Sequence, residues 1–102
     1  MLMDGNCFKV AANIVVHGLP DATLCHGQPI RRGPEGGDRY WHAWVELDGT
    51  AIDRANGLDI ELAAATYYLI GNIEADKVLR YTREEAVRYM LETGHYGPWI
   101  EE

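Results

Sequence analysis

The chain has 102 residues, of which 47% are apolar and 25% charged, and its formal net charge is -7 at neutral pH. This composition is typical of a folded globular protein and excludes collagen-like, coiled-coil and disordered chains. A chain of this length can bury one hydrophobic core, so we expect a single domain over residues 1–102.

The charge balance and the apolar pattern limit the partners. An acidic chain with a pI near 4.9 argues against nucleic acid, because that affinity comes from clustered Lys and Arg. The local basic cluster of Arg31, Arg32 and Arg39 is diluted by Glu35 and Asp38. No apolar run approaches the roughly 20 residues of a membrane helix, and no secretory leader is visible. We therefore expect a cytoplasmic protein with no membrane partner and with two free thiols.

The first third of the chain predicts a helix, a strand and a loop. Residues 6–17 have apolar positions at helical spacing, with Asn6 as N-cap and Cys7 at the first helical position. Gly18 ends this helix. Residues 23–30 predict a short strand limited by Pro29, and residues 31–39 have the composition of an exposed loop.

The middle of the chain predicts a β-hairpin. Residues 40–47 and 50–54 are rich in aromatic and branched side chains, and Asp48-Gly49 between them favours a two-residue turn. This turn sets the register, with Val45 opposite Ile52 and Trp44 opposite Asp53.

The last part of the chain predicts a helix over 59–70, a break at 71–72 and a strand over 77–81. Thr82 and Glu85 form a capping box that opens a last helix, which ends at Gly94. The aromatic tail, residues 94–99, is expected to pack back on the core. The fold class is therefore α+β, with an N-terminal helix that carries Cys7 on a small antiparallel sheet and with a C-terminal helix.

Cys7 is a candidate nucleophile because the positive end of a helix dipole stabilises a thiolate. Its backbone N–H lacks an intrahelical acceptor and could donate to an oxyanion. The structural alternative is that Cys7 is a small buried apolar residue. The adjacent Cys25 and His26 point to opposite faces of a strand and cannot act as nucleophile and base, so we expect Cys25 in the core.

His42 and Asp53 are diagonal neighbours on one face of the hairpin, close enough for a hydrogen bond. An Asp that binds one ring nitrogen fixes the tautomer and leaves the other nitrogen to accept a thiol proton. Of the strand tryptophans, Trp44 shares this face and is the candidate for a cleft wall. The structural alternative is a half-buried histidine satisfied by a neighbouring carboxylate.

Three runs carry a resemblance to a known superfamily: residues 5–8 (Gly-Asn-Cys-Phe), 40–47 (Tyr-Trp-His-Ala-Trp-Val-Glu-Leu) and 51–54 (Ala-Ile-Asp-Arg). They resemble the Cys, His and Asp motifs of the transglutaminase-like branch of the papain-like cysteine enzymes. A similar layout occurs in arylamine N-acetyltransferases and in the leader peptidases of lasso-peptide maturation. The resemblance implies a papain-like core, Cys7 as nucleophile, His42 as general acid and base, and Asp53 as the residue that orients His42.

The chain departs from this pattern at the oxyanion site. Papain-like proteases place a Gln several residues before the Cys, whereas only six residues precede Cys7 and none is Gln. Asn6 and Gln28 are the amide candidates. The short chain also leaves little room for a substrate pocket, so we expect a loop such as 33–37, or a partner, to supply specificity.

The leading hypothesis is a cysteine hydrolase that cleaves an amide or isopeptide bond of a peptide or protein through a thioester. Scattered Cys and His residues without metal-ligand spacing support no zinc site, and we expect no cofactor. Two alternatives stay open. The same residues would serve an acyl or amine transferase, and the same scaffold would serve a non-catalytic protein-interaction domain.

Overall fold

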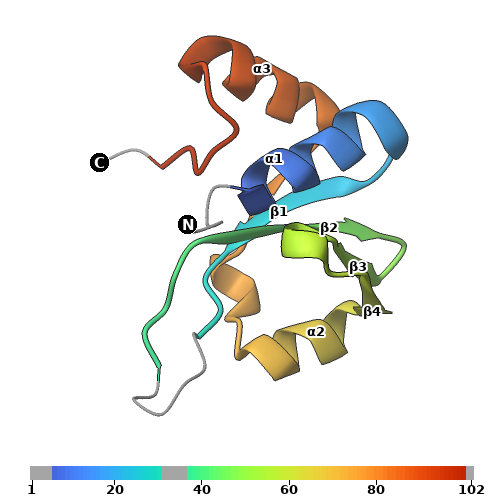
Figure 1. The fold of residues 1–102 in the computed structure, drawn as a ribbon, viewed down its shortest axis with the longest axis vertical. Helices are drawn as coiled ribbons and strands as arrows, with labels where there is room; N and C mark the ends of the chain where they lie inside the picture. Colours follow the sequence, from blue (N-terminus) through green and yellow to red (C-terminus); the bar gives the residue numbers. More distant parts are fainter. Residues whose placement is uncertain (1–5, 31–36, 101–102) are drawn as a thin grey trace.

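The computed structural model describes residues 6–30 and 37–100, which form a small α+β domain (Figure 1). A five-stranded antiparallel sheet in the order β4-β3-β2-β1-β5 lies between the helices. Helices α1 and α3 cover one face of the sheet and α2 covers the other. The predicted fold class is confirmed at this level.

The first predicted helix is divided in two. Helix α1 spans Asn6–Asn13 and continues as a π-helical segment, Ile14–Gly18. Strand β1 spans Thr23–Gly27 and is shorter than predicted. Pro29 has no N–H to donate to a ladder, and beyond it the chain makes only an isolated bridge between Ile30 and Arg39.

The predicted hairpin is confirmed. Strands β2 (His42–Leu47) and β3 (Thr50–Asp53) pair with Val45 opposite Ile52. Asp48 and Gly49 have φ angles of 52° and 80°, as a type I′ turn requires. The strands are antiparallel, so the start of β2 and the end of β3 lie at the same end of the sheet.

The predicted helix over 59–70 is wrong in its first part. Residues Ile60–Ala63 form β4, the edge strand next to β3, and only Ala64–Gly71 form helix α2. Ile60 and Leu62 are half-buried, whereas Glu61 between them is exposed. This alternation fits a strand, and pairing with β3 prevails over helix propensity. Asn72, with φ of 53°, ends α2 at the predicted break.

The C-terminal part follows the predictions closely. Strand β5 spans Leu79–Tyr81 and helix α3 spans Arg83–Thr93. Thr82 Oγ accepts from the Glu85 N–H at 3.1 Å, and Glu85 Oε1 accepts from the Thr82 N–H at 2.9 Å. The capping box is thus complete, and Gly94 ends the helix with φ of 79°.

Each face of the sheet has its own core. The core under α1 and α3 includes Phe8, Leu24, Val45 and Ala86. The core under α2 consists of the buried residues Cys25, Trp44, Ala51, Tyr67 and Ile73. The predicted core position of Cys25 is therefore confirmed.

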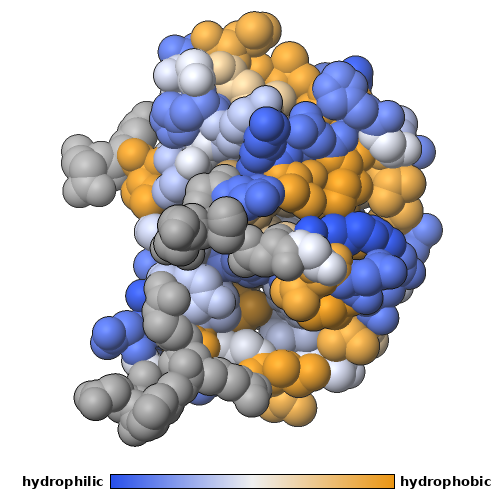
Figure 2. Space-filling model, viewed as in Figure 1, coloured by the Kyte–Doolittle hydropathy of each residue, from blue (hydrophilic) through white to orange (hydrophobic). Residues whose placement is uncertain are grey.

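The aromatic tail packs on the core as predicted. The Trp99 ring lies 5.0 Å from that of Tyr81 and 5.1 Å from that of Tyr89. On the outer surface, apolar patches lie among hydrophilic side chains (Figure 2), and Leu69 and Leu91 are among the most exposed apolar residues. No helix in the described part of the chain is long and apolar enough to cross a membrane.

Candidate active site

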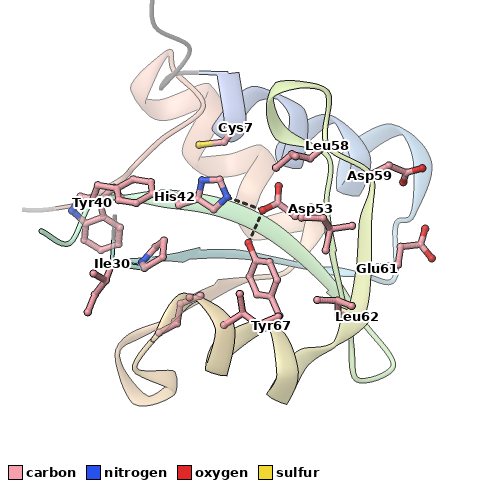
Figure 3. Close-up of a pocket in the computed structure, with 16 residues that line it drawn as sticks. Cys7, Ile30, Tyr40, His42, Asp53, Leu58, Asp59, Glu61, Leu62 and Tyr67 are labelled. Carbon is pink, nitrogen blue, oxygen red and sulfur yellow. Dashed lines mark hydrogen bonds and ion pairs between the residues drawn. The ribbon is translucent and has the colours of Figure 1, made fainter. Parts of the chain in front are cut away.

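A cavity of about 690 Å³ opens at the end of the sheet where β2 begins and β3 ends (Figure 3). Cys7, His42 and Asp53 all line it. Cys7 comes from the first turn of α1 on one side of the sheet, and α2 closes the cavity on the other side. The structure thus brings the three sequence-predicted residues together.

His42 links the other two residues. Its Nε2 atom lies 2.8 Å from Asp53 Oδ2, with 12% of the His42 side chain and 5% of the Asp53 side chain exposed. The Cys7 sulfur lies beside the imidazole ring of His42 in Figure 3, on the side away from Asp53. Since Nε2 faces Asp53, Nδ1 is the nitrogen available to the thiol.

The electrostatics favour a protonated His42. Burial by itself would lower the pKa of His42, but hydrogen bonds to Asp53 and Cys7, and the negative charges of both groups, raise it to about 9. The imidazolium form is therefore the main form at neutral pH.

Asp53 is held by more donors than sequence reasoning found. Tyr67 donates its hydroxyl to Asp53 Oδ2 at 2.6 Å, and the Ala55 N–H donates to Oδ1 at 3.0 Å. Burial would raise the pKa of Asp53, but the hydrogen bonds from His42, Tyr67 and Ala55 outweigh it and lower the pKa. Asp53 therefore stays ionised and fixed in one orientation.

Tyr67 itself lies in α2, is nine-tenths buried and lines the cavity. Burial and the adjacent Asp53 raise its pKa, so the hydroxyl remains a donor. No local pattern marks Tyr67, because its contact with Asp53 depends on how α2 follows β4. The prediction of one helix over 59–70 missed that junction.

Trp44 is not a cleft wall, contrary to the prediction. It is fully buried and does not line the cavity. Its ring stacks against His42 at 6.2 Å, and its Nε1–H donates to Glu46 at 3.0 Å. The alternation that puts Trp44 on the His42 face also puts it deeper under α2. Tyr40 and Trp41, before β2, line the cavity instead.

The two amide candidates lie outside the cavity. Asn6 is the first residue of α1 and is exposed, and neither Asn6 nor Gln28 is among the lining residues. The backbone carbonyl of Gln28 accepts from Arg39 at 2.6 Å. The expected role of these amides next to Cys7 is therefore not supported by their positions.

The cavity is larger than the sequence led us to expect. Its far wall consists of residues 58–62, which lead into and form β4, together with α2, and the predicted continuous helix would not have created it. Most of the 33–37 loop, which was expected to supply specificity, lies outside the described residues.

Within residues 6–30 and 37–100, no three His, Cys, Asp or Glu side chains lie close enough together to hold a metal ion.

Comparison of the chain with protein-family models, curated proteins and solved structures found no match.

Proposed function

We propose that the protein is a cysteine hydrolase with a papain-like catalytic arrangement, which cleaves an amide or isopeptide bond through a thioester intermediate. The observation that carries the proposal is the arrangement of Cys7, His42 and Asp53 at the wall of one cavity, with the Cys7 sulfur beside the imidazole ring whose Nε2 binds Asp53. A structural histidine would need the carboxylate but would have no need of a thiol and an open cavity on its other side.

In the proposed reaction, the proton of the Cys7 thiol already lies on His42 Nδ1 before the substrate binds, and the thiolate attacks the substrate carbonyl carbon. The tetrahedral intermediate collapses when the C–N bond breaks, and the imidazolium returns the proton to the leaving amine. His42 then takes a proton from water, which attacks the thioester. The carboxylic acid leaves, and the thiolate of Cys7 and the imidazolium of His42 are restored. Asp53 remains ionised and keeps Nδ1 turned toward the sulfur.

The backbone supplies the remaining candidate for stabilising the oxyanion. Cys7 is the second residue of α1, and the first N–H groups of a helix have no intrahelical acceptor. An oxyanion formed at the Cys7 sulfur would lie next to the Cys7 N–H and the positive end of the helix dipole. We therefore propose the Cys7 N–H as a donor to the oxyanion.

The test is hydrolysis of a pooled library of peptides with fluorogenic amide leaving groups. We expect turnover by the parent protein, a loss of at least about 1,000-fold in Cys7→Ala, and retained turnover in Cys25→Ala. Acid quenching during turnover should trap an acyl group on Cys7, detectable by peptide mass mapping. Turnover that persists in Cys7→Ala would contradict the proposal, as would an acyl group on any other residue.

A further inference from the structure

We infer that the substrate is a peptide with a bulky apolar side chain, and with no acidic side chain, at the two residues on the acyl side of the scissile bond. This inference rests on the proposed function and names its substrate class. The observations that carry it are the apolar walls of the cavity and the signs of the charges around it.

The apolar walls lie on two sides of the reactive groups. One wall consists of Ile30, Ile70 and Ile73, and the other includes Leu58 and Leu62. In Figure 3, Leu58 lies close to Cys7, and Ile30 lies beyond the His42 ring. A substrate carbonyl at the Cys7 sulfur would therefore place its neighbouring side chains between two aliphatic surfaces.

The first wall is held in place before any substrate binds. The Ile30 N–H donates to the Gly71 carbonyl at 3.0 Å. The Arg39 guanidinium donates to the Gln28 carbonyl at 2.6 Å and to the Asn72 carbonyl at 2.8 Å. These bonds connect the end of β1 to the end of α2. A preformed wall loses little entropy when it buries an apolar group.

The charges argue against an acidic substrate. None of the described residues that line the cavity is Lys or Arg, whereas Asp59 and Glu61 are both among them. Arg54 pairs with both of these carboxylates, which point away from Cys7 in Figure 3. The whole chain carries a net charge of -7. An acidic side chain, or the phosphates of an acyl-coenzyme A, would meet the carboxylates of Asp59 and Glu61. It would find no Lys or Arg among the described lining residues, and the His42 imidazolium is already paired with Asp53.

The size of the expected preference follows from burial. Transfer of a Leu or Phe side chain from water into an apolar site corresponds to a preference of about 10- to 100-fold. We therefore expect substrates with Leu to react about 10- to 100-fold faster than substrates with Glu at the acyl-side residue that contacts the apolar walls.

The experiment uses peptidyl electrophiles, in which an acetylated dipeptide carries an acyloxymethyl ketone in place of the scissile amide. Leu, Phe, Lys and Glu occupy each of the two residues in turn, and intact mass gives the rate of Cys7 labelling. We expect the Leu and Phe probes to label at least about 10-fold faster than the Glu probe at one residue. Equal rates, or a faster Glu probe, would overturn the substrate class.

A matched pair of variants locates the selectivity. Ile70 lines the cavity, whereas its neighbour Leu69 lines only an adjoining hollow and is 81% exposed. Ile70→Lys should reduce the ratio of Leu to Glu labelling at least about 5-fold, and Leu69→Lys should leave it unchanged. An unchanged ratio in Ile70→Lys would overturn the assignment of this wall.

Iodoacetamide separates the two levels of the proposal, since it needs no peptide site. If iodoacetamide alkylates Cys7 but no peptide probe does, the inferred peptide substrate is wrong, although Cys7 is a reactive thiol. If neither reagent modifies Cys7 in the folded protein, the proposed hydrolase fails and the substrate class fails with it.

Discussion

Replacement of Asp53 by Asn is expected to remove the interaction that keeps His42 protonated. The substitution preserves the shape of a side chain that is 4% exposed and removes its negative charge. The pKa of His42 rises from 6.5 to about 9 in the folded protein. At about 1.36 kcal/mol per pKa unit, this rise corresponds to about 3 kcal/mol of folding free energy.

The pH range of this effect follows from its sign. A histidine with a raised pKa stabilises the fold fully below 6.5, and the stabilisation is lost as the pH rises through about 9. The difference in unfolding free energy between the parent and Asp53→Asn should therefore decrease by up to about 3 kcal/mol between pH 6 and pH 10, because Cys7, which also raises the His42 pKa, remains in the variant. Urea unfolding followed by tryptophan fluorescence measures this difference, and titrations common to both proteins cancel.

Tyr67→Phe is the matched control, because it removes a hydrogen bond to Asp53 but leaves the carboxylate charged. It should lower stability by about 1–3 kcal/mol while the dependence on pH stays close to that of the parent. NMR titration should show a lower His42 pKa in Asp53→Asn than in the parent. A stability difference between the parent and Asp53→Asn that is constant from pH 6 to pH 10 would refute the reasoning.

Two further predictions concern the core under α1 and α3. His26 is fully buried among Phe8, Tyr81 and Trp99. No described residue forms a hydrogen bond with its ring nitrogens, and burial lowers the pKa of His26 to about 4. The fold therefore loses stability as the pH falls from 6.5 through 4. Urea unfolding of His26→Leu should show a loss of unfolding free energy over this pH range that is smaller by about 3 kcal/mol than in the parent. An equal loss of unfolding free energy in the variant would contradict the burial of a neutral His26. Gly97→Ala should lower the free energy of unfolding by about 1–3 kcal/mol, measured by thermal unfolding, because φ is 119° and a Cβ would lie 2.6 Å from His26 Cε1. Gly49→Ala, with φ of 80° and no atom within 4 Å, should cost less, and an equal cost would exclude the steric contact as the cause.

The sequence predicts the pairing of His42 with Asp53 because both lie on one hairpin. A two-residue turn fixes the register, and alternation then decides which side chains share a face. The position of Cys7 is harder to derive, since it depends on how α1 packs over the end of the sheet. The order of Cys, His and Asp in the resembled motifs suggested that contact, and the packing of α1 brings it about.

Tyr67 and the cavity could not be derived in the same way. Both depend on the strand β4, whose four residues lie next to a helix and carry no turn signal between Ala63 and Ala64. Trp44 shows a related limit, because alternation gives the face of a residue but not its depth under the helix that covers that face. Tertiary packing decides both properties.

The central claim is that His42 activates Cys7, and native-state alkylation with iodoacetamide tests it most directly. Cys25 serves as the internal reference, since it is fully buried and burial raises its pKa. At pH 6 we expect Cys7 to be alkylated and Cys25 not, and His42→Ala to slow the Cys7 reaction at least about 10-fold in protein whose circular dichroism matches the parent. Equal rates of Cys7 alkylation in the parent and in His42→Ala would contradict the account.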